Sequence, residues 1–169
     1  MQKLTFIGIL LIIISACERE YVNPAEETFL FYENATLTSE APFASDGNQI
    51  VFHHYYKAED EENIADDEYS EELFFELEDK EEFQLKGEAL KSIDLIFKQY
   101  CYCPEYSNLQ VVDGYLNGSR KGADKYLIEA NVEMIGYYLY EGDTLDSQVI
   151  HSAFTGYFKK SNKPTGKLN

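Results

Sequence analysis

The last third of the chain contains three long segments in which apolar and polar residues alternate, at 109–118, 125–140 and 148–159. In the middle segment one set of positions is apolar and the set between them is polar: Tyr126, Ile128, Ala130, Val132 and Met134 alternate with Glu129, Asn131 and Glu133. Alternation of period two places the apolar side chains on one face of a β-strand. Turn-forming residues separate the segments, which predicts an antiparallel meander whose apolar face must be buried against a second layer.

Glycines interrupt two of these predicted strands. Gly114 and Gly156 lie inside alternating segments, where glycine weakens a strand unless the backbone bulges or a neighbouring backbone comes close. We therefore expect a bulge or a close approach at both positions.

Upstream segments alternate in the same way. Residues 50–57 read as one strand, and in residues 72–78 three leucine or phenylalanine residues face away from three glutamates, with Phe74 as the exception. A tight connection near Asp79 predicts a hairpin between residues 72–78 and the alternating residues that end at Gly87.

Residues 88–100 fit two kinds of secondary structure. Leu90, Ile93, Phe97 and Tyr100 have helical spacing, whereas Ile93, Leu95 and Phe97 also alternate as in a strand. We favour the helix. The whole pattern predicts a mainly β fold, an antiparallel sandwich or small barrel with at most one short helix.

The N-terminus has the features of an export signal. Lys3 precedes an apolar run from Leu4 to Ile14, and the motif Ile14-Ser15-Ala16-Cys17 resembles the lipobox of bacterial lipoproteins. The resemblance implies that residues 1–16 are a signal peptide and that Cys17 carries acyl chains such as palmitate. It also implies an outer membrane-anchored protein that faces the periplasm or the cell surface. The apolar run is shorter than the roughly 20 residues of a membrane-spanning helix, and a secretory signal followed by a free Cys17 is the alternative.

The expected domain organisation follows from this processing. Residues 17–27 form a tether, residues 28–160 form a single β-rich domain, and residues 161–169 form a flexible tail. The domain resembles small uncharacterised Gram-negative lipoproteins only in its general architecture. The resemblance therefore transfers no functional residue other than the acylated Cys17.

The chain is strongly acidic. It has 14 Lys and Arg against 31 Asp and Glu, and removing Lys3 with the signal leaves 13 − 31 = −18 formal charges. Such a surface repels phosphate, so nucleic acid and anionic lipid headgroups are poor partners, and we expect no binding of nucleic acid. The densest acidic segment is residues 59–82, and residues 58–69 are interpreted as a solvated loop that leads into a strand. An irregular calcium site is the alternative, because Ca²⁺ binds several carboxylate oxygens at once. Its candidate ligands are Asp60, Glu62, Asp66, Asp67 and Glu68.

Cysteines and histidines provide little support for catalysis. With Cys17 assigned to lipid, Cys101 and Cys103 remain as a possible disulfide in an exported protein, with a soft-metal or redox site as less favoured readings. His53 and His54 are neighbours on a predicted strand, so they point to opposite faces and cannot both bind one ion. No motif of a known catalytic nucleophile or phosphate loop is present, and we expect a protein that is not an enzyme.

The expected function is a non-enzymatic binding or accessory role toward a glycan, a peptide or a protein partner. Tyrosines are the candidate contact residues, since the chain has 14 of them and no Trp. The candidates are Tyr55, Tyr56, Tyr102, Tyr106, Tyr137, Tyr138 and Tyr140. A calcium-binding or other metal-dependent module and a lipocalin-like carrier of an apolar ligand are the alternatives.

Overall fold

The computed structural model describes residues 22–163 apart from positions 42, 62–67, 102–105 and 141–142. Several of the predicted site residues therefore lie outside the described residues: Cys17, Glu62, Asp66, Asp67, Tyr102 and Cys103. Of Asp60, Tyr138 and Tyr140, only the backbone is described.

Eight strands form one open mixed sheet in the order β6-β8-β9-β10-β2-β3-β5-β7. Their bounds are β2 Glu26–Leu37, β3 Ala44–Lys57, β5 Ser70–Leu77, β6 Glu82–Lys86, β7 Leu95–Tyr100, β8 Tyr106–Arg120, β9 Lys125–Tyr140 and β10 Asp143–Lys160. A short pair, β1 (Val22–Asn23) and β4 (Asp60–Glu61), and one helical turn, α1 (Glu88–Lys91), complete the described elements. The prediction of a mainly β fold is confirmed, and so is the antiparallel meander, which β8, β9 and β10 form.

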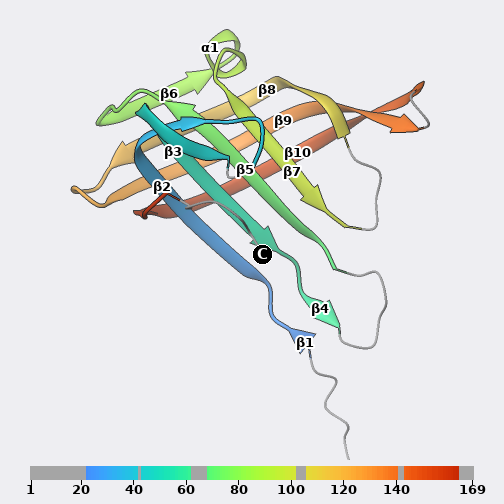
Figure 1. Cartoon of the computed structure of the whole chain (residues 1–169), viewed down its shortest axis with the longest axis horizontal. Coiled ribbons are helices and arrows are strands. Elements are labelled where there is room, and N and C mark those ends of the chain that lie inside the picture. Colours follow the sequence, from blue (N-terminus) through green and yellow to red (C-terminus); the bar gives the residue numbers. More distant parts are fainter. Residues whose placement is uncertain (1–21, 42, 62–67, 102–105, 141–142, 164–169) are drawn as a thin grey trace, which may run out of the picture.

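The sheet folds over on itself into two layers. Phe52 of β3 and Phe83 of β6 are five strand positions apart in the sheet order, a separation of about 24 Å in a flat sheet. Their ring centroids lie only 6.0 Å apart. The first layer (β2, β3, β5 and β7) therefore faces the second layer (β6, β8, β9 and β10), and Figure 1 shows the strands of the two layers crossing. The result is the predicted sandwich-like arrangement.

Aromatic rings fill the space between the layers. The Phe52 ring centroid lies 5.1 Å from that of Tyr126 and 5.6 Å from that of Phe158, and Phe31 contacts Tyr126 edge-on at 5.2 Å. All four side chains are almost fully buried. Phe52, Tyr126 and Phe158 belong to the inward positions of the alternating segments, so the sequence pattern places most of this cluster.

One corner joins the two layers. β10 and β2 pair in parallel only at Lys159↔Leu30 and Lys160↔Phe31. Beside this corner the Arg120 guanidinium lies 2.5 Å from Asp79, 3.3 Å from Glu33 and 4.6 Å from the centre of the Tyr126 ring. These contacts tie β2, β8, β9 and the segment after β5 together, so this end of the sandwich is closed.

The predicted helix over residues 88–100 is wrong for most of its length. Only Glu88–Lys91 is helical, and Leu95–Tyr100 is strand β7, which pairs with β5 along six residues. Leu90, on the helical turn, is fully buried. Pairing with β5 satisfies the backbone groups of the later residues, and this tertiary contact overrides the helical spacing.

The predicted hairpin across Asp79 is also wrong. β5 pairs with β3 and β7, whereas β6 pairs with β8 on the opposite side of the sheet. The Phe83 ring of β6 occupies the space in which a side chain at Gly118 of β8 would stand, 2.1 Å from an added Cβ. Packing between these two residues fixes β6 in the second layer.

The two strand glycines serve different purposes. Gly114 has φ of 118°, and a Cβ there would lie 2.0 Å from the backbone oxygen of Asn131, so the predicted close approach of a backbone is confirmed. At Gly156 the neighbour is a side chain, because the Phe29 ring would lie 2.5 Å from an added Cβ. Both positions exclude a side chain for steric reasons.

Candidate functional site

His53 and His54 lie on opposite faces of β3, as predicted. His54 faces inward, and its ring packs against the rings of Phe29 and Phe154, at centroid distances of 5.0 and 4.2 Å. Its Nε2 lies 2.9 Å from Oε1 of Glu27, while the buried Nδ1 has no protein partner. Burial lowers the pKa of His54 against the opposing effect of Glu27. The ring is therefore held mainly by packing.

A polar row continues the inner face beyond His54. Glu27, Tyr56 and Glu71 lie directly opposite one another on β2, β3 and β5. Tyr69 donates a hydrogen bond of 2.7 Å to Oε2 of Glu71. Burial raises the pKa of Glu71, and the nearby Glu27 carboxylate adds to the rise, although the bond from Tyr69 opposes it. This inner polar row therefore places two carboxyl groups close enough to repel each other.

A chain of hydrogen bonds crosses the opposite face of the same strands. The Tyr32 hydroxyl lies 3.3 Å from Nδ1 of His53, and Nε2 of His53 lies 3.2 Å from Oε1 of Glu72. The Tyr100 hydroxyl donates to Oε2 of Glu72 at 2.8 Å. With the imidazole proton on Nε2, Tyr32 donates to His53 and His53 donates to Glu72. We call these four residues the outer-face chain.

The protonation states of the outer-face chain agree with this direction of donation. Burial opposes ionisation of Glu72, but the hydrogen bonds from His53 and Tyr100 outweigh it and lower the pKa of the carboxyl group. Burial raises the pKa of Tyr32 to about 12, and the Glu72 charge adds to the rise. Burial, followed by the bond to Glu72, raises the pKa of Tyr100 to about 12. At neutral pH an ionised Glu72 therefore holds a protonated Tyr100.

A groove opens beside Tyr100 at this end of the first layer. It encloses about 370 Å³ and is lined by Tyr55, Lys57, Glu68, Tyr69, Ser70, Tyr100 and Cys101. Ser70 lies between Lys57 and Tyr100 in one cross-strand row, so a short side chain between two long ones leaves the hollow. The Tyr100 side chain is 48% exposed, which makes its ring available to a ligand. We call this site the tyrosine groove.

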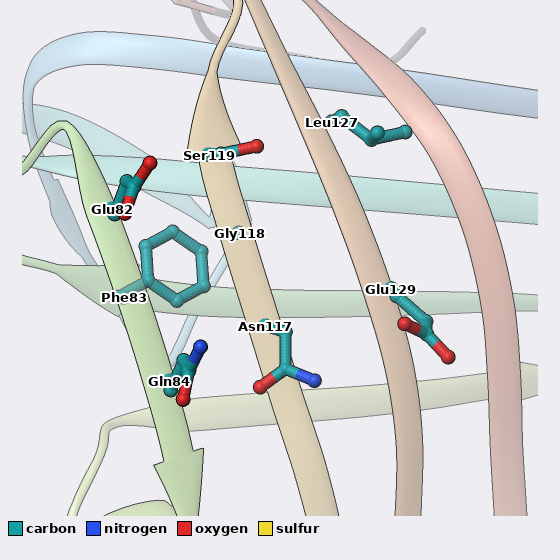
Figure 2. A pocket seen from close by; sticks show the side chains of 8 residues that line it. All are labelled: Glu82, Phe83, Gln84, Asn117, Gly118, Ser119, Leu127 and Glu129. Atoms are coloured by element: carbon teal, nitrogen blue, oxygen red, sulfur yellow. The ribbon is translucent and has the colours of Figure 1, made fainter.

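A second hollow, of about 400 Å³, lies on β6, β8 and β9 of the second layer. Figure 2 shows Gln84, Asn117 and Glu129 on these three neighbouring strands. The aromatic ring in its lining belongs to Phe83, which packs against the core and over Gly118. The ring of this hollow is half-buried, whereas Tyr100 is 48% exposed, so the tyrosine groove is the stronger candidate for ligand binding.

The seven tyrosines predicted as contacts do not form one site. Tyr55 lines the tyrosine groove, whereas Tyr56 belongs to the inner polar row. Tyr106 packs against the core and donates a 3.0 Å hydrogen bond to Gln148, and Tyr137 is half-buried in β9. Tyr102 and the side chains of Tyr138 and Tyr140 lie outside the described residues.

Sequence reasoning missed Tyr100 and Tyr69 as groove residues. Tyr100 was placed on a helix face by the favoured reading of residues 88–100, and the competing strand alternation was the signal that could have found it. Tyr69 precedes β5 by one residue and is the last residue of the segment interpreted as a solvated acidic loop.

The predicted metal and cysteine residues are described only in part. Glu68 is exposed and lines the tyrosine groove, and Asp60 lies in β4. Within the described ranges, no group of three or more His, Cys, Asp or Glu residues is arranged to hold a metal ion. Cys101 is disulfide-bonded, and both other cysteines of the chain lie outside the described residues.

Comparison with known proteins identifies no relative: no family model, curated protein or solved structure matches the chain. A search of the described residues for helices found none with the length and hydropathy needed to cross a membrane.

Proposed function

We propose that this chain is an exported, lipid-anchored binding protein without enzymatic activity, and that its tyrosine groove takes a neutral sugar unit of a glycan. The observation that carries the proposal is the Tyr100 ring, which is half exposed beside a groove and fixed by its hydroxyl to Glu72. A ring held in this way loses little conformational entropy when a ligand packs on it.

The lining of the groove suits a sugar better than an apolar molecule. Sugars combine faces of C–H groups with a rim of hydroxyls, so they need an aromatic surface together with hydrogen-bonding side chains. Tyr55 and Tyr100 supply the rings, and Lys57, Glu68 and Ser70 supply donors and acceptors. The formal charge of the whole chain, −17, disfavours an acidic glycan.

The proposed anchor would hold the groove near the membrane. Only four residues separate an acylated Cys17 from the start of β1 at Val22, and the five residue steps between them span at most about 17 Å when fully extended. β1 pairs with β4, which begins three residues after the groove residue Lys57. A ligand displayed close to the bilayer surface would therefore be within reach.

Calorimetric titration with a panel of neutral oligosaccharides tests the groove. Truncation of a tyrosine that anchors a ligand costs more than about 1 kcal/mol, so we expect Tyr100→Ala to weaken binding at least fivefold. Tyr157→Ala is the matched control, since Tyr157 is 53% exposed on β10, outside the groove lining. Equal affinities for the wild type and Tyr100→Ala would contradict the proposed site.

Mass spectrometry of the mature N-terminus tests the anchor separately. We expect a chain that begins at Cys17 and carries acyl chains. An unmodified Cys17 or an intact Met1 would contradict the lipid anchor without affecting the assignment of the groove.

A further inference from the structure

Most of β10 pairs along only one of its edges. β9 pairs with β10 from Asp143 to Lys159, whereas β2 pairs with β10 only at Lys159 and Lys160. Figure 1 shows β2 and β10 diverging from their shared corner. Across the described residues, no backbone hydrogen bond from another strand reaches the second edge of Val149–Phe158. This free edge is ten residues long.

The free edge lacks the usual protection against strand pairing. Proteins guard exposed edges with charges, prolines or short strands. The segment Val149–Phe158 contains no proline and no Asp, Glu, Lys or Arg, although such charged residues make up 27% of the chain. The sheet's two terminal strands differ from it: β6 has five residues and two charged ones, and β7 has six residues and includes Lys98. The unprotected edge is therefore specific to β10.

Side chains along this edge have the regular alternation of a strand that can accept a neighbour. Ile150, Ser152 and Phe154 face the core and are at most 8% exposed, while Val149 and Tyr157 face outward and are 45% and 53% exposed. The buried hydroxyl of Ser152 has no protein partner. An added strand would extend the second layer and place its own side chains beside these outward ones.

Charge decides what kind of strand fits. Acidic groups lie on both sides of β10: Glu133 of β9, on the paired side, lies 3.7 Å from His151, and Glu27 of the diverging β2, on the free side, is 44% exposed. A second copy of the chain would bring the same strongly negative charge, so repulsion disfavours pairing between two β10 edges. An extended segment with Lys or Arg at its ends would gain main-chain hydrogen bonds and favourable charge pairing together.

We propose that the free edge of β10 binds an extended, basic-ended peptide segment by strand addition. The observation that carries this is a ten-residue, uncharged strand edge whose pairing with β2 ends at the corner. The site is separate from the tyrosine groove and does not depend on its function.

A synthetic peptide of alternating threonine and valine, with two lysines at each end, is the probe. Hydrogen exchange of the full mature protein is followed with and without the peptide, and binding is measured by fluorescence anisotropy. We expect slower exchange in residues 149–158 and binding that weakens as salt is added. Lysine on an edge strand blocks pairing, so Ala153→Lys is expected to weaken binding at least tenfold.

Asn131→Lys is the matched control, because Asn131 of β9 lies directly opposite Ala153 and is exposed on the same face, away from the free edge. It adds the same charge and should reduce binding less than threefold. Equal loss in both variants would show a purely electrostatic contact and overturn the proposal. Protection confined to β6 or β7, absence of binding, or dimerisation of the protein through β10 would also overturn it.

Discussion

The two faces of β3 carry neighbouring histidines that are paired with glutamates in different ways. On the inner face, His54 packs against two phenylalanine rings, and one of its buried nitrogens has no protein partner. On the outer face, both ring nitrogens of His53 have partners, and the chain of bonds ends at the exposed ring of Tyr100. The inner face is held together by packing and tolerates a buried polar atom that has no hydrogen-bond partner. On the outer face, a chain of hydrogen bonds positions the exposed ring of Tyr100.

Truncation of one phenylalanine on each face should produce the largest losses in the free energy of unfolding, with the greater loss on the inner face. Phe52 contacts several rings of the inner core, whereas Phe74 contacts His53 and Phe43 on the outer face. We expect Phe52→Ala to lower the free energy of unfolding by about 3–5 kcal/mol and Phe74→Ala by about 2–3 kcal/mol. Urea denaturation measures both, and a larger loss for Phe74→Ala would reverse our view of which face stabilises the fold.

Replacing each histidine by leucine separates packing from hydrogen bonding. His53→Leu removes the partner of the buried Tyr32 hydroxyl, which should cost about 1–3 kcal/mol. His54→Leu removes an unsatisfied nitrogen while it keeps an apolar side chain against the two phenylalanine rings, so we expect a change within about 1 kcal/mol at pH 7.5. If His54→Leu proved the more destabilising variant in urea, the inner Glu27–His54 pair would be a stronger contact than its geometry indicates.

Stability should also depend on pH through His54. Its pKa is lowered in the fold, mainly by burial, so between that value and about 6.5 the unfolded chain binds more protons. The contribution of neutral His54 is thus fully present above pH 6.5 and is lost as the pH falls toward the folded pKa. Urea midpoints from pH 7.5 to 5.5 should fall less steeply in His54→Leu than in the wild type. Identical slopes would contradict the buried, neutral imidazole.

The adjacent residues Glu71 and Glu72 should respond with opposite signs, and these are the smallest effects. The pKa of Glu71 is raised by burial, so Glu71→Gln should increase stability at pH 7 by a few tenths of a kcal/mol and lose this advantage near pH 4. The pKa of Glu72 is lowered by its hydrogen bonds, so Glu72→Gln should cost about 1 kcal/mol at pH 7. Thermal unfolding at pH 7 and pH 4 measures the stability change of each variant. Changes of the same sign in the two variants would contradict the difference between the inner and outer faces.

Local patterns predicted the parts of this molecule that depend on local geometry. The alternation through β8, β9 and β10 predicted the meander, and strand geometry alone predicted that His53 and His54 diverge. Strand order could not be predicted in this way, because the choice between β5 and β8 as partner of β6 depends on Phe83 packing over Gly118. The site was missed for the same reason: Tyr100 becomes a groove residue only through the pairing of β7 with β5.

The most direct test of the account is to map a bound neutral oligosaccharide by NMR, using backbone amide shifts of the mature protein. If the tyrosine groove binds the sugar, chemical-shift changes should be concentrated at Tyr55, Ser70 and Tyr100. They should extend along the outer-face chain through Glu72 to His53. Shifts centred instead on the inward residues around Phe29 and Phe154, or the absence of any shift with every sugar tested, would contradict it.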